Sequence, residues 1–257
     1  MESELYEGSH RDVFRFFLQL VDDSETQTAA LLDLTPWENV TSILSIGGGE
    51  GVVEATLLRR APLSTLWYLD PSSEQCDAFR HHMRNTDLFD RVADVAETTF
   101  QDYVVPQEFD RIVSMFSWFY IGTDQRWLSK LLGALSPSGV ACIVMPNAES
   151  IEADFNRRFS PDERTTLVSE EVVSALQALD CHVDQHSYTK WLAVDELFVG
   201  ERLSDASLAF AAFVALRSID SFTPEDKRSI TELINSKRTE NGIPLSWDAI
   251  TVERNRT

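Results

Sequence analysis

The sequence predicts an α/β fold, in which helices cover both faces of a doubly wound, mostly parallel sheet of seven strands. From Thr41 onward, short apolar runs alternate with amphipathic ones, which is the pattern of successive βαβ units. The apolar runs are continuous, as expected for parallel strands that are buried on both faces. The first of them, residues 42–46, leads directly into a glycine-rich turn at residues 47–51. The rest of the chain is organised around that junction of strand, turn and helix.

The other elements are expected in chain order. Strands are expected at residues 42–46, 65–70, 91–96, 110–116, 140–145, 182–192 and 249–253. Helices are expected at residues 12–21, in a short segment ending at 32, and at 50–61, 73–84, 123–135, 169–179, 204–219 and 224–237. The 257 residues are expected to form a single domain. Within this domain, we expect residues 1–36 to form a helical lid. We expect a helical insert at about residues 200–240, before the last strand.

The glycine turn contains Gly47, Gly49 and Gly51 in a G-x-G-x-G pattern. Glycine suits a turn that visits positive φ and that a ligand approaches closely. The dinucleotide fingerprint requires a further glycine where this chain has Val52. A phosphate-binding loop of the G-x-x-x-x-G-K type is excluded, because no Lys-Ser or Lys-Thr pair follows.

The second expected strand ends in Asp70, about 20 residues after the turn, at the distance where an acidic residue reaches a ribose. A carboxylate can accept hydrogen bonds from both ribose hydroxyls. Ser72 or Ser73 can then cap the helix that follows. Together with the turn, Asp70 indicates a nucleoside-containing cofactor.

These residues carry a family resemblance. The G-x-G-x-G turn resembles the first motif of class I S-adenosylmethionine-dependent methyltransferases. Segments 42–51, 70–75 and 114–121 together resemble histamine N-methyltransferase and its relatives, and the order of elements is similar over nearly the whole chain. Ser45 stands where most class I methyltransferases keep an acid, a departure shared with these relatives. The resemblance implies a Rossmann-like fold, with a cofactor-binding half at 37–150 and an acceptor-side half at 151–257.

The resemblance also implies roles for individual residues. S-adenosylmethionine would be contacted by Gly47, Gly49, Gly51, Asp70, Gln75, Thr99 and Met115. On the acceptor side, Glu25 is the nearest match to a family glutamate. Phe116 stands where the family has a glutamine, and Ser246 falls near a family asparagine. We expect Glu25 and Tyr120 to be catalytic, and Phe116, Trp118, Phe119 and Ser246 to bind the substrate.

The chemistry of methyl transfer narrows the expected activity. In an in-line displacement a lone pair attacks the sulfonium methyl carbon, so an amine must arrive neutral and aligned with the methyl group. Positioning and exclusion of water can therefore suffice without a strong base. The aromatic run at 118–120 can attract a cationic amine or sulfonium by cation–π interaction. We therefore expect N-methylation of a small amine, aromatic or cationic, and Phe116 favours an acceptor larger or more apolar than histamine. O-methylation, methylation of a peptide amine, and a non-catalytic cofactor- or partner-binding role remain alternatives.

Composition excludes several other classes. The formal net charge of −20 argues against nucleic acid as a partner. An acidic field favours a cationic partner, although solubility alone accounts for most of this charge. No apolar run approaches the ~20 residues of a membrane span, so we expect a cytoplasmic protein with no membrane partner. The three cysteines suit reduced thiols, and no metal-binding constellation is present.

Overall fold

The central sheet of the computed structural model has seven strands in the order β3-β2-β1-β4-β5-β9-β6. The structure describes residues 24–160, 166–200, 202–214 and 218–255, so the expected helix at 12–21 lies outside the described residues. The strands are β1 (Ser42–Ile46), β2 (Thr65–Asp70), β3 (Val92–Glu97), β4 (Phe109–Met115), β5 (Leu135–Pro146), β6 (Cys181–Leu192) and β9 (Ile243–Arg254). Strands β1 to β5 are parallel, and β9 runs antiparallel between β5 and β6. The predicted fold class is confirmed.

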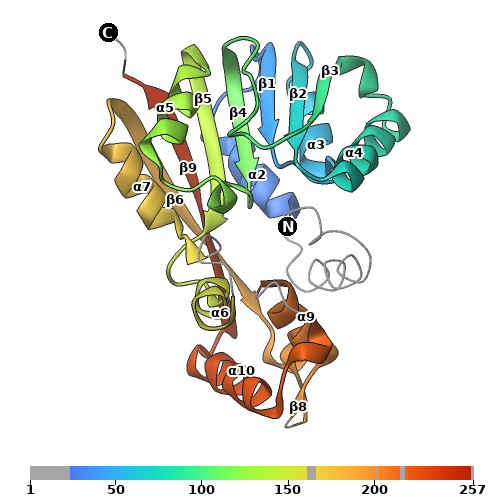
Figure 1. Cartoon of the computed structure of the whole chain (residues 1–257), viewed down its shortest axis with the longest axis vertical. Coiled ribbons are helices and arrows are strands. Elements are labelled where there is room, and N and C mark those ends of the chain that lie inside the picture. Colours follow the sequence, from blue (N-terminus) through green and yellow to red (C-terminus); the bar gives the residue numbers. More distant parts are fainter. Residues whose placement is uncertain (1–23, 161–165, 201, 215–217, 256–257) are drawn as a thin grey trace.

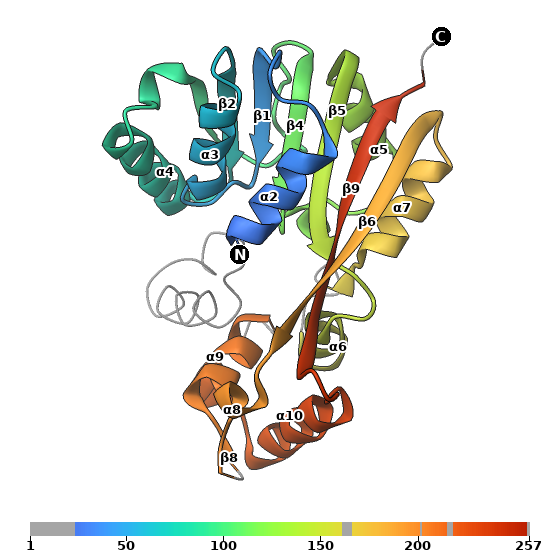
Figure 2. The ribbon, with the colours of Figure 1, turned by 180° about the vertical axis from the view of Figure 1, so that it is seen from behind.

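Helices cover both faces of the sheet (Figures 1 and 2). One face carries α2 (Ser24–Leu34), α3 (Val52–Arg60) and α4 (Ser73–Asn85), and the other carries α5 (Gln125–Gly133) and α7 (Ser169–Gln177). Each face has its own apolar core, one built around Leu57 and Phe79 and the other around Leu131 and Leu176. Short 3-10 helices lie at Phe89–Arg91 (η2), Trp118–Tyr120 (η3) and Ile219–Ser221 (η5).

A lower lobe lies beyond the carboxyl ends of β1, β4 and β5 (Figure 1). It contains α6 (Ile151–Phe159), α8 (Val194–Leu197), α9 (Asp205–Val214), α10 (Pro224–Ser236) and the hairpin of β7 (Phe198–Val199) and β8 (Arg202–Leu203). A third apolar core, which includes Phe155, Phe210 and Ile234, holds these elements together. The insert was predicted at the right place in the chain, but α6 was not predicted.

The predicted bounds of the last strand were wrong, because β9 begins at Ile243 and not at 249. Pro244 and Asp248 are poor strand formers, which hid the first half of the strand from a propensity argument. Pro244 is tolerated because only β6 pairs with β9 at that point, opposite Trp191. The long β6–β9 ladder therefore carries the chain from the sheet into the lower lobe.

A buried carboxylate joins the sheet to the start of α7. Asp248 is completely buried in β9 and accepts hydrogen bonds from the side chains of Asn147 (3.0 Å), Gln185 (2.5 Å) and Ser169. These donors come from the end of β5, from β6 and from the first turn of α7. Because all three bonds end on one charged group, they fix these segments relative to one another.

Candidate active site

The glycine turn between β1 and α3 forms the centre of the candidate site. Gly47, Gly49 and Gly51 have φ of 65°, 54° and 85°, which an L side chain rarely adopts. A Cβ at Gly47 would lie 2.5 Å from the Cβ of Ser117. Among the described residues, a Cβ at Gly49 would meet only Oε1 of Gln75, at 3.7 Å, so this side of the turn is open with respect to them. Gly47 is thus required for packing, whereas Gly49 leaves room for a ligand.

Asp70 ends β2 beside the turn, as predicted. Its carboxylate accepts the N–H of Gly49 at 3.4 Å and the N–H of Ser72 at 2.9 Å. Burial raises the pKa of Asp70, and these two N–H groups act in the opposite direction. The carboxylate therefore lies against the open part of the turn, in a position from which it can accept hydroxyl groups of a ligand.

Gln75 supplies a test of whether the site fits a polar cofactor. It lies in the first turn of α4, where Ser72 accepts its backbone N–H at 3.3 Å and caps the helix as predicted. The side chain is buried, yet Oε1 has no donor in the described structure. A buried acceptor without a donor is rare and needs an explanation. A ligand with hydroxyl or ammonium donors, seated on Gly49, supplies one.

The remaining two predicted cofactor residues lie farther along the same edge of the sheet. Thr99 follows β3, and its hydroxyl donates to Asp102 at 2.9 Å and accepts the N–H of Asp102 at 3.2 Å. That hydroxyl is engaged in holding its own turn. Met115 is the last residue of β4 and packs, half-buried, against the core beneath α3 and α4.

The segment after β4 turns sharply. Phe116 has φ of 51°, a conformation that is strained for a bulky residue. Its N–H donates to the carbonyl of Val144 at 2.7 Å, which keeps it attached to β5. Backbone strain of this kind is commonly retained at ligand-binding sites.

The prediction that Trp118 contacts substrate was wrong. Its side chain is completely buried in the core beneath α5 and α7, 5.8 Å from the ring of Phe100. The indole N–H donates to the carbonyl of Gly122 at 3.2 Å, which satisfies its single donor. An aromatic run in the sequence does not reveal which ring faces inward, because the 3-10 helix η3 sends successive side chains in different directions.

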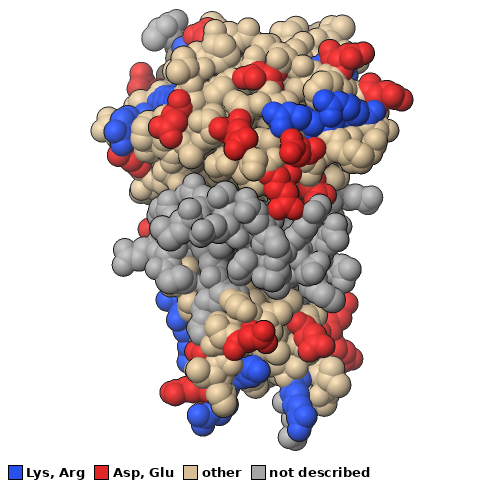
Figure 3. Space-filling model, turned by 45° about the vertical axis from the view of Figure 1, so that its right-hand side comes forward, with Lys and Arg blue, Asp and Glu red and all other residues tan. Residues whose placement is uncertain are grey.

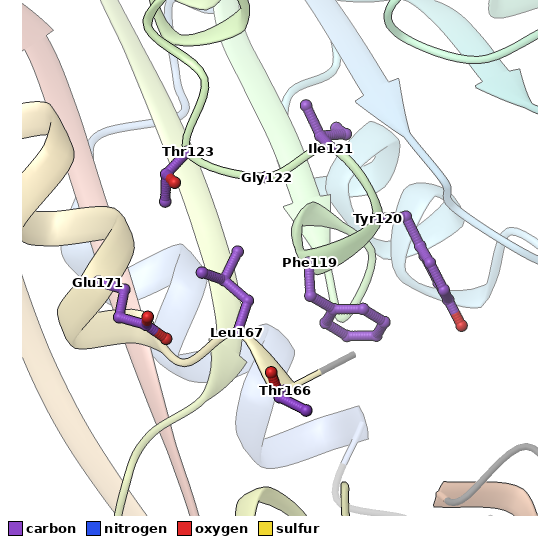
Figure 4. Close-up of a pocket in the computed structure, with 8 residues that line it drawn as sticks. All are labelled: Phe119, Tyr120, Ile121, Gly122, Thr123, Thr166, Leu167 and Glu171. Atoms are coloured by element: carbon purple, nitrogen blue, oxygen red, sulfur yellow. The ribbon is translucent and has the colours of Figure 1, made fainter. Parts of the chain in front are cut away.

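The two neighbouring rings lie in a more open setting. Phe119 and Tyr120 are half-buried and help to line a pocket of about 170 Å³, together with Ile121, Gly122, Thr123, Thr166, Leu167 and Glu171. In Figure 4 the ring of Phe119 points toward Thr166, and Tyr120 extends away from the rest of the lining. The two rings lie 4.5 Å apart. The substrate-binding role expected of Phe119 stays a prediction.

The two remaining predicted acceptor residues lie in β9 and α2. Ser246 is buried within β9, and its hydroxyl is 3.0 Å from that of Thr189 in β6. Its acceptor role stays a prediction. Glu25 falls in the first turn of α2, and its side chain lies outside the described residues.

Two side-chain pairs around the turn were not predicted. Ser117 donates to the carbonyl of Ile46 at 2.7 Å and bonds the hydroxyl of Ser114 at 2.7 Å, which ties the end of β4 to the turn. Glu54, in the first turn of α3, is buried and accepts the hydroxyl of Ser45 at 2.7 Å. One feature of the sequence points to the contact between Glu54 and Ser45: Glu54 is an acid at the third position of the helix that follows the glycine turn.

The described part of the chain shows neither a metal site nor a membrane-spanning helix. His, Cys, Asp and Glu side chains of these residues do not gather in groups that could hold a metal ion. No helix among them is long and apolar enough to cross a membrane. On the face in Figure 3, acidic and basic side chains are interspersed over the sheet body and the lower lobe, so the negative charge is not gathered there into one patch.

Comparison with known proteins identifies the fold. Residues 43–139 match the family model described as a methyltransferase domain. The protein YcgJ from Bacillus subtilis superposes with a TM-score of 0.64 at 13% identity, over 90% of this chain and 99% of its own. Coclaurine N-methyltransferase, solved with N-methylheliamine and S-adenosylhomocysteine, superposes with a TM-score of 0.60 at 12% identity. The match covers 90% of this chain and 72% of that protein. The [4+2]-cyclase SpnF superposes with a TM-score of 0.57 at 15% identity, over 90% of this chain and 81% of its own.

At these identities the solved structures show the fold alone, whereas the family match covers the glycine turn, Asp70 and Gln75. The residues around the turn fit a ligand that carries hydroxyl and ammonium donors. Residues 43–139 therefore match a methyltransferase domain, and the whole chain has a Rossmann-like α/β fold that it shares with the solved structures. S-adenosylmethionine is the cofactor that this match indicates.

Proposed function

We propose that this protein is an S-adenosylmethionine-dependent methyltransferase that N-methylates a small amine. The observation that carries the proposal is the open side of Gly49, flanked by the carboxylate of Asp70 and by the unpaired oxygen of Gln75. The match to a methyltransferase domain supports it. The resemblance to histamine N-methyltransferase and the shared fold of coclaurine N-methyltransferase favour an amine as the acceptor.

The residues at the turn have distinct tasks in this proposal. When bound, S-adenosylmethionine supplies a methyl group on a positively charged sulfonium. Asp70 accepts hydrogen bonds from the ribose hydroxyls, and Gln75 accepts a further donor of the cofactor. Gly47, locked against Ser117, keeps the turn in a shape that leaves Gly49 accessible.

The acceptor side is assigned to residues that follow β4. Phe116 presents an apolar side chain beside the cofactor edge, which favours an aromatic or extended amine. Phe119 and Tyr120 provide ring faces that attract a cationic group, worth about 0.5–2 kcal/mol each. Glu25 and Tyr120 are the groups we assign to holding the amine, and desolvation would favour its neutral, nucleophilic form.

A second function is favoured by one specific finding. SpnF, which shares the fold, is described as a [4+2]-cyclase, so this fold hosts reactions other than methyl transfer. A protein that binds the cofactor or another partner without transferring the methyl group is therefore the alternative. O-methylation differs only in the acceptor atom and is tested by the same acceptor panel.

The first experiment is calorimetric titration with S-adenosylmethionine, S-adenosylhomocysteine and NADH. We expect micromolar binding of both adenosyl ligands and no binding of NADH. Asp70→Ala should weaken adenosyl ligand binding at least tenfold, because a carboxylate bonded to two hydroxyls contributes about 1.5–3 kcal/mol. Asp77→Ala is the matched control, since this exposed aspartate in α4 pairs with Arg80 at the surface. Unchanged affinity in the Asp70 variant would remove the ribose assignment.

The second experiment separates the candidate activities. Primary and secondary amines, phenols and short peptides are incubated with the protein and with cofactor labelled in the methyl group. Label in amines alone supports the proposed activity, and label in phenols supports O-methylation. Cofactor binding without transfer to any acceptor would favour the non-catalytic alternative.

A further inference from the structure

The carboxyl group of Glu54 lies against the backbone of the glycine turn. Glu54 is 2% exposed and reaches back from the first turn of α3. Its Oε1 accepts the Ser45 hydroxyl at 2.7 Å, and a Cβ added to Gly48 would lie only 2.5 Å from the same oxygen. The carboxyl group is therefore in direct contact with the turn, so its charge acts on a ligand that is bound at the turn.

Two buried oxygen atoms beside this turn lack a hydrogen-bond donor. One is Oε2 of Glu54 and the other is Oε1 of Gln75, whose side chain is 8% exposed. They lie next to Gly48 and Gly49, two successive residues. Unpaired buried acceptors are uncommon in folded proteins. Two of them beside one open turn point to a ligand that brings donors or positive charge.

Within the described part of the chain, the groups that act on Glu54 are negatively charged or neutral and include no cation. Burial raises its pKa to about 7, the hydroxyl of Ser45 and its own N–H lower it, and Asp70 at the end of β2 raises it further. Tyr68 of β2 also faces this group, and Cys76 of α4 acts on Tyr68. Among the described residues, no Lys, Arg or His acts on Glu54. A positively charged ligand is what this cluster lacks.

We propose that Glu54 makes the site select the positively charged sulfonium cofactor over its neutral thioether product, by releasing its proton when the sulfonium cofactor binds. The inference rests on the proposed function. S-adenosylmethionine carries one positive charge more than S-adenosylhomocysteine, whereas the two are otherwise alike. In a buried site, that extra charge favours the ionised form of a nearby carboxyl group. The proton passes to solvent, and the carboxyl group takes one up again once the charge is lost.

The pH dependence of binding follows from this linkage. Below the pKa of the free protein, the sulfonium cofactor must expel a proton, so its affinity rises with pH. With a pKa of about 7, the affinity should rise about fivefold from pH 6 to pH 7 and less than twofold from pH 7 to pH 8. The neutral thioether product leaves the pKa of Glu54 unchanged, so it binds without proton release and its affinity should change little over this range.

The test is calorimetric titration of the full chain with both adenosyl ligands at pH 6, 7 and 8, in buffers with different heats of ionisation. In the wild type, we expect release of close to one proton at pH 6 for the sulfonium ligand only. Glu54→Gln should abolish that proton release. It should also make the ratio of the two affinities independent of pH, apart from the titration of the ligand itself, which is the same for both variants. Glu152→Gln is the matched control, because Glu152 is a second buried glutamate whose pKa burial raises to about 7, and it lies in α6.

The outcomes separate the two proposals. If neither adenosyl ligand binds the wild type, the proposed function fails. If both ligands bind, two results overturn the role of Glu54. In the first, Glu54→Gln keeps the wild-type ratio of the two affinities and the wild-type proton release. In the second, Glu54→Gln weakens the binding of both ligands equally. Should Glu54→Gln fail to fold in a thermal scan, Ser45→Ala decides. It removes the hydrogen bond that lowers the pKa of Glu54, so the midpoint of the affinity profile must move to higher pH, and an unmoved midpoint overturns the proposal.

Discussion

Gly51→Ala tests how tightly the glycine turn is locked to the helices behind it. Gly51 has φ of 85°, and a Cβ there would lie 2.5 Å from Cδ2 of Phe79. The ring of Phe79 is completely buried and stacks on Tyr68, with ring centroids 3.9 Å apart. It has no free space into which it could move, so the backbone of the turn must shift instead.

The expected loss has two parts. The left-handed backbone conformation costs an alanine about 1–2 kcal/mol. Overpacking against a buried ring adds about 1–3 kcal/mol. The free energy of unfolding should therefore fall by about 2–5 kcal/mol in Gly51→Ala. Because Tyr68 also donates to the carbonyl of Gly49 at 2.7 Å, a shift of the stacked rings reaches the open part of the turn. Adenosyl ligand binding should weaken as well.

Gly122→Ala is the matched control. Gly122 has nearly the same φ, 90°, but a Cβ there would meet nothing within 4 Å. It should lose only the backbone part, about 1–2 kcal/mol. Urea unfolding followed by fluorescence measures both variants. If they lose the same stability, packing against Phe79 contributes nothing and the reasoning is refuted.

Three further predictions concern polar groups inside or at the edge of the core. In the ligand-free protein, burial raises the pKa of Glu54 and of Glu152 from the ordinary 4.5 to about 7. The stability that each group contributes is therefore complete below about pH 4.5 and is lost as the pH rises through 7. Urea unfolding from pH 4 to 8 should show this decline, and Glu152→Gln should reduce its slope by about 1.4 kcal/mol per pH unit; an unchanged slope contradicts the shift. Asp248→Ala leaves two buried donors, Asn147 and Ser169, without their acceptor and should cost about 2–5 kcal/mol in urea unfolding, with a loss below 1 kcal/mol arguing against the network. Lys130→Met removes an ammonium that binds three carbonyls of residues 100–103, so amide hydrogen exchange should accelerate there and not in β1, and equal protection would contradict that role.

The sequence determined the parts of this protein that depend on local pattern. Alternating apolar and amphipathic runs were sufficient for the class of sheet, because each strand and helix must bury its own apolar face. The spacing of Gly47, Gly49, Gly51 and Asp70 was sufficient to predict that the glycine turn and Asp70 lie together, because parallel strands bring their carboxyl ends to one edge. Positive φ at all three glycines and the N-cap at Ser72 are local requirements, and the structure has both.

Only the tertiary structure decided which side chains of the same local type face the site. Trp118 and Phe119 are neighbours in one aromatic run, yet one is in the core and the other lines a pocket, because the direction of η3 is set by what packs around it. The contact of Glu54 with Ser45 joins a helix to a strand across the turn, and neither residue type alone indicates it. The first half of β9 forms because β6 pairs with it along 12 residues, against the preference of Pro244. Such features depend on contacts between segments that are distant in the chain, and these exist only after the sheet has assembled.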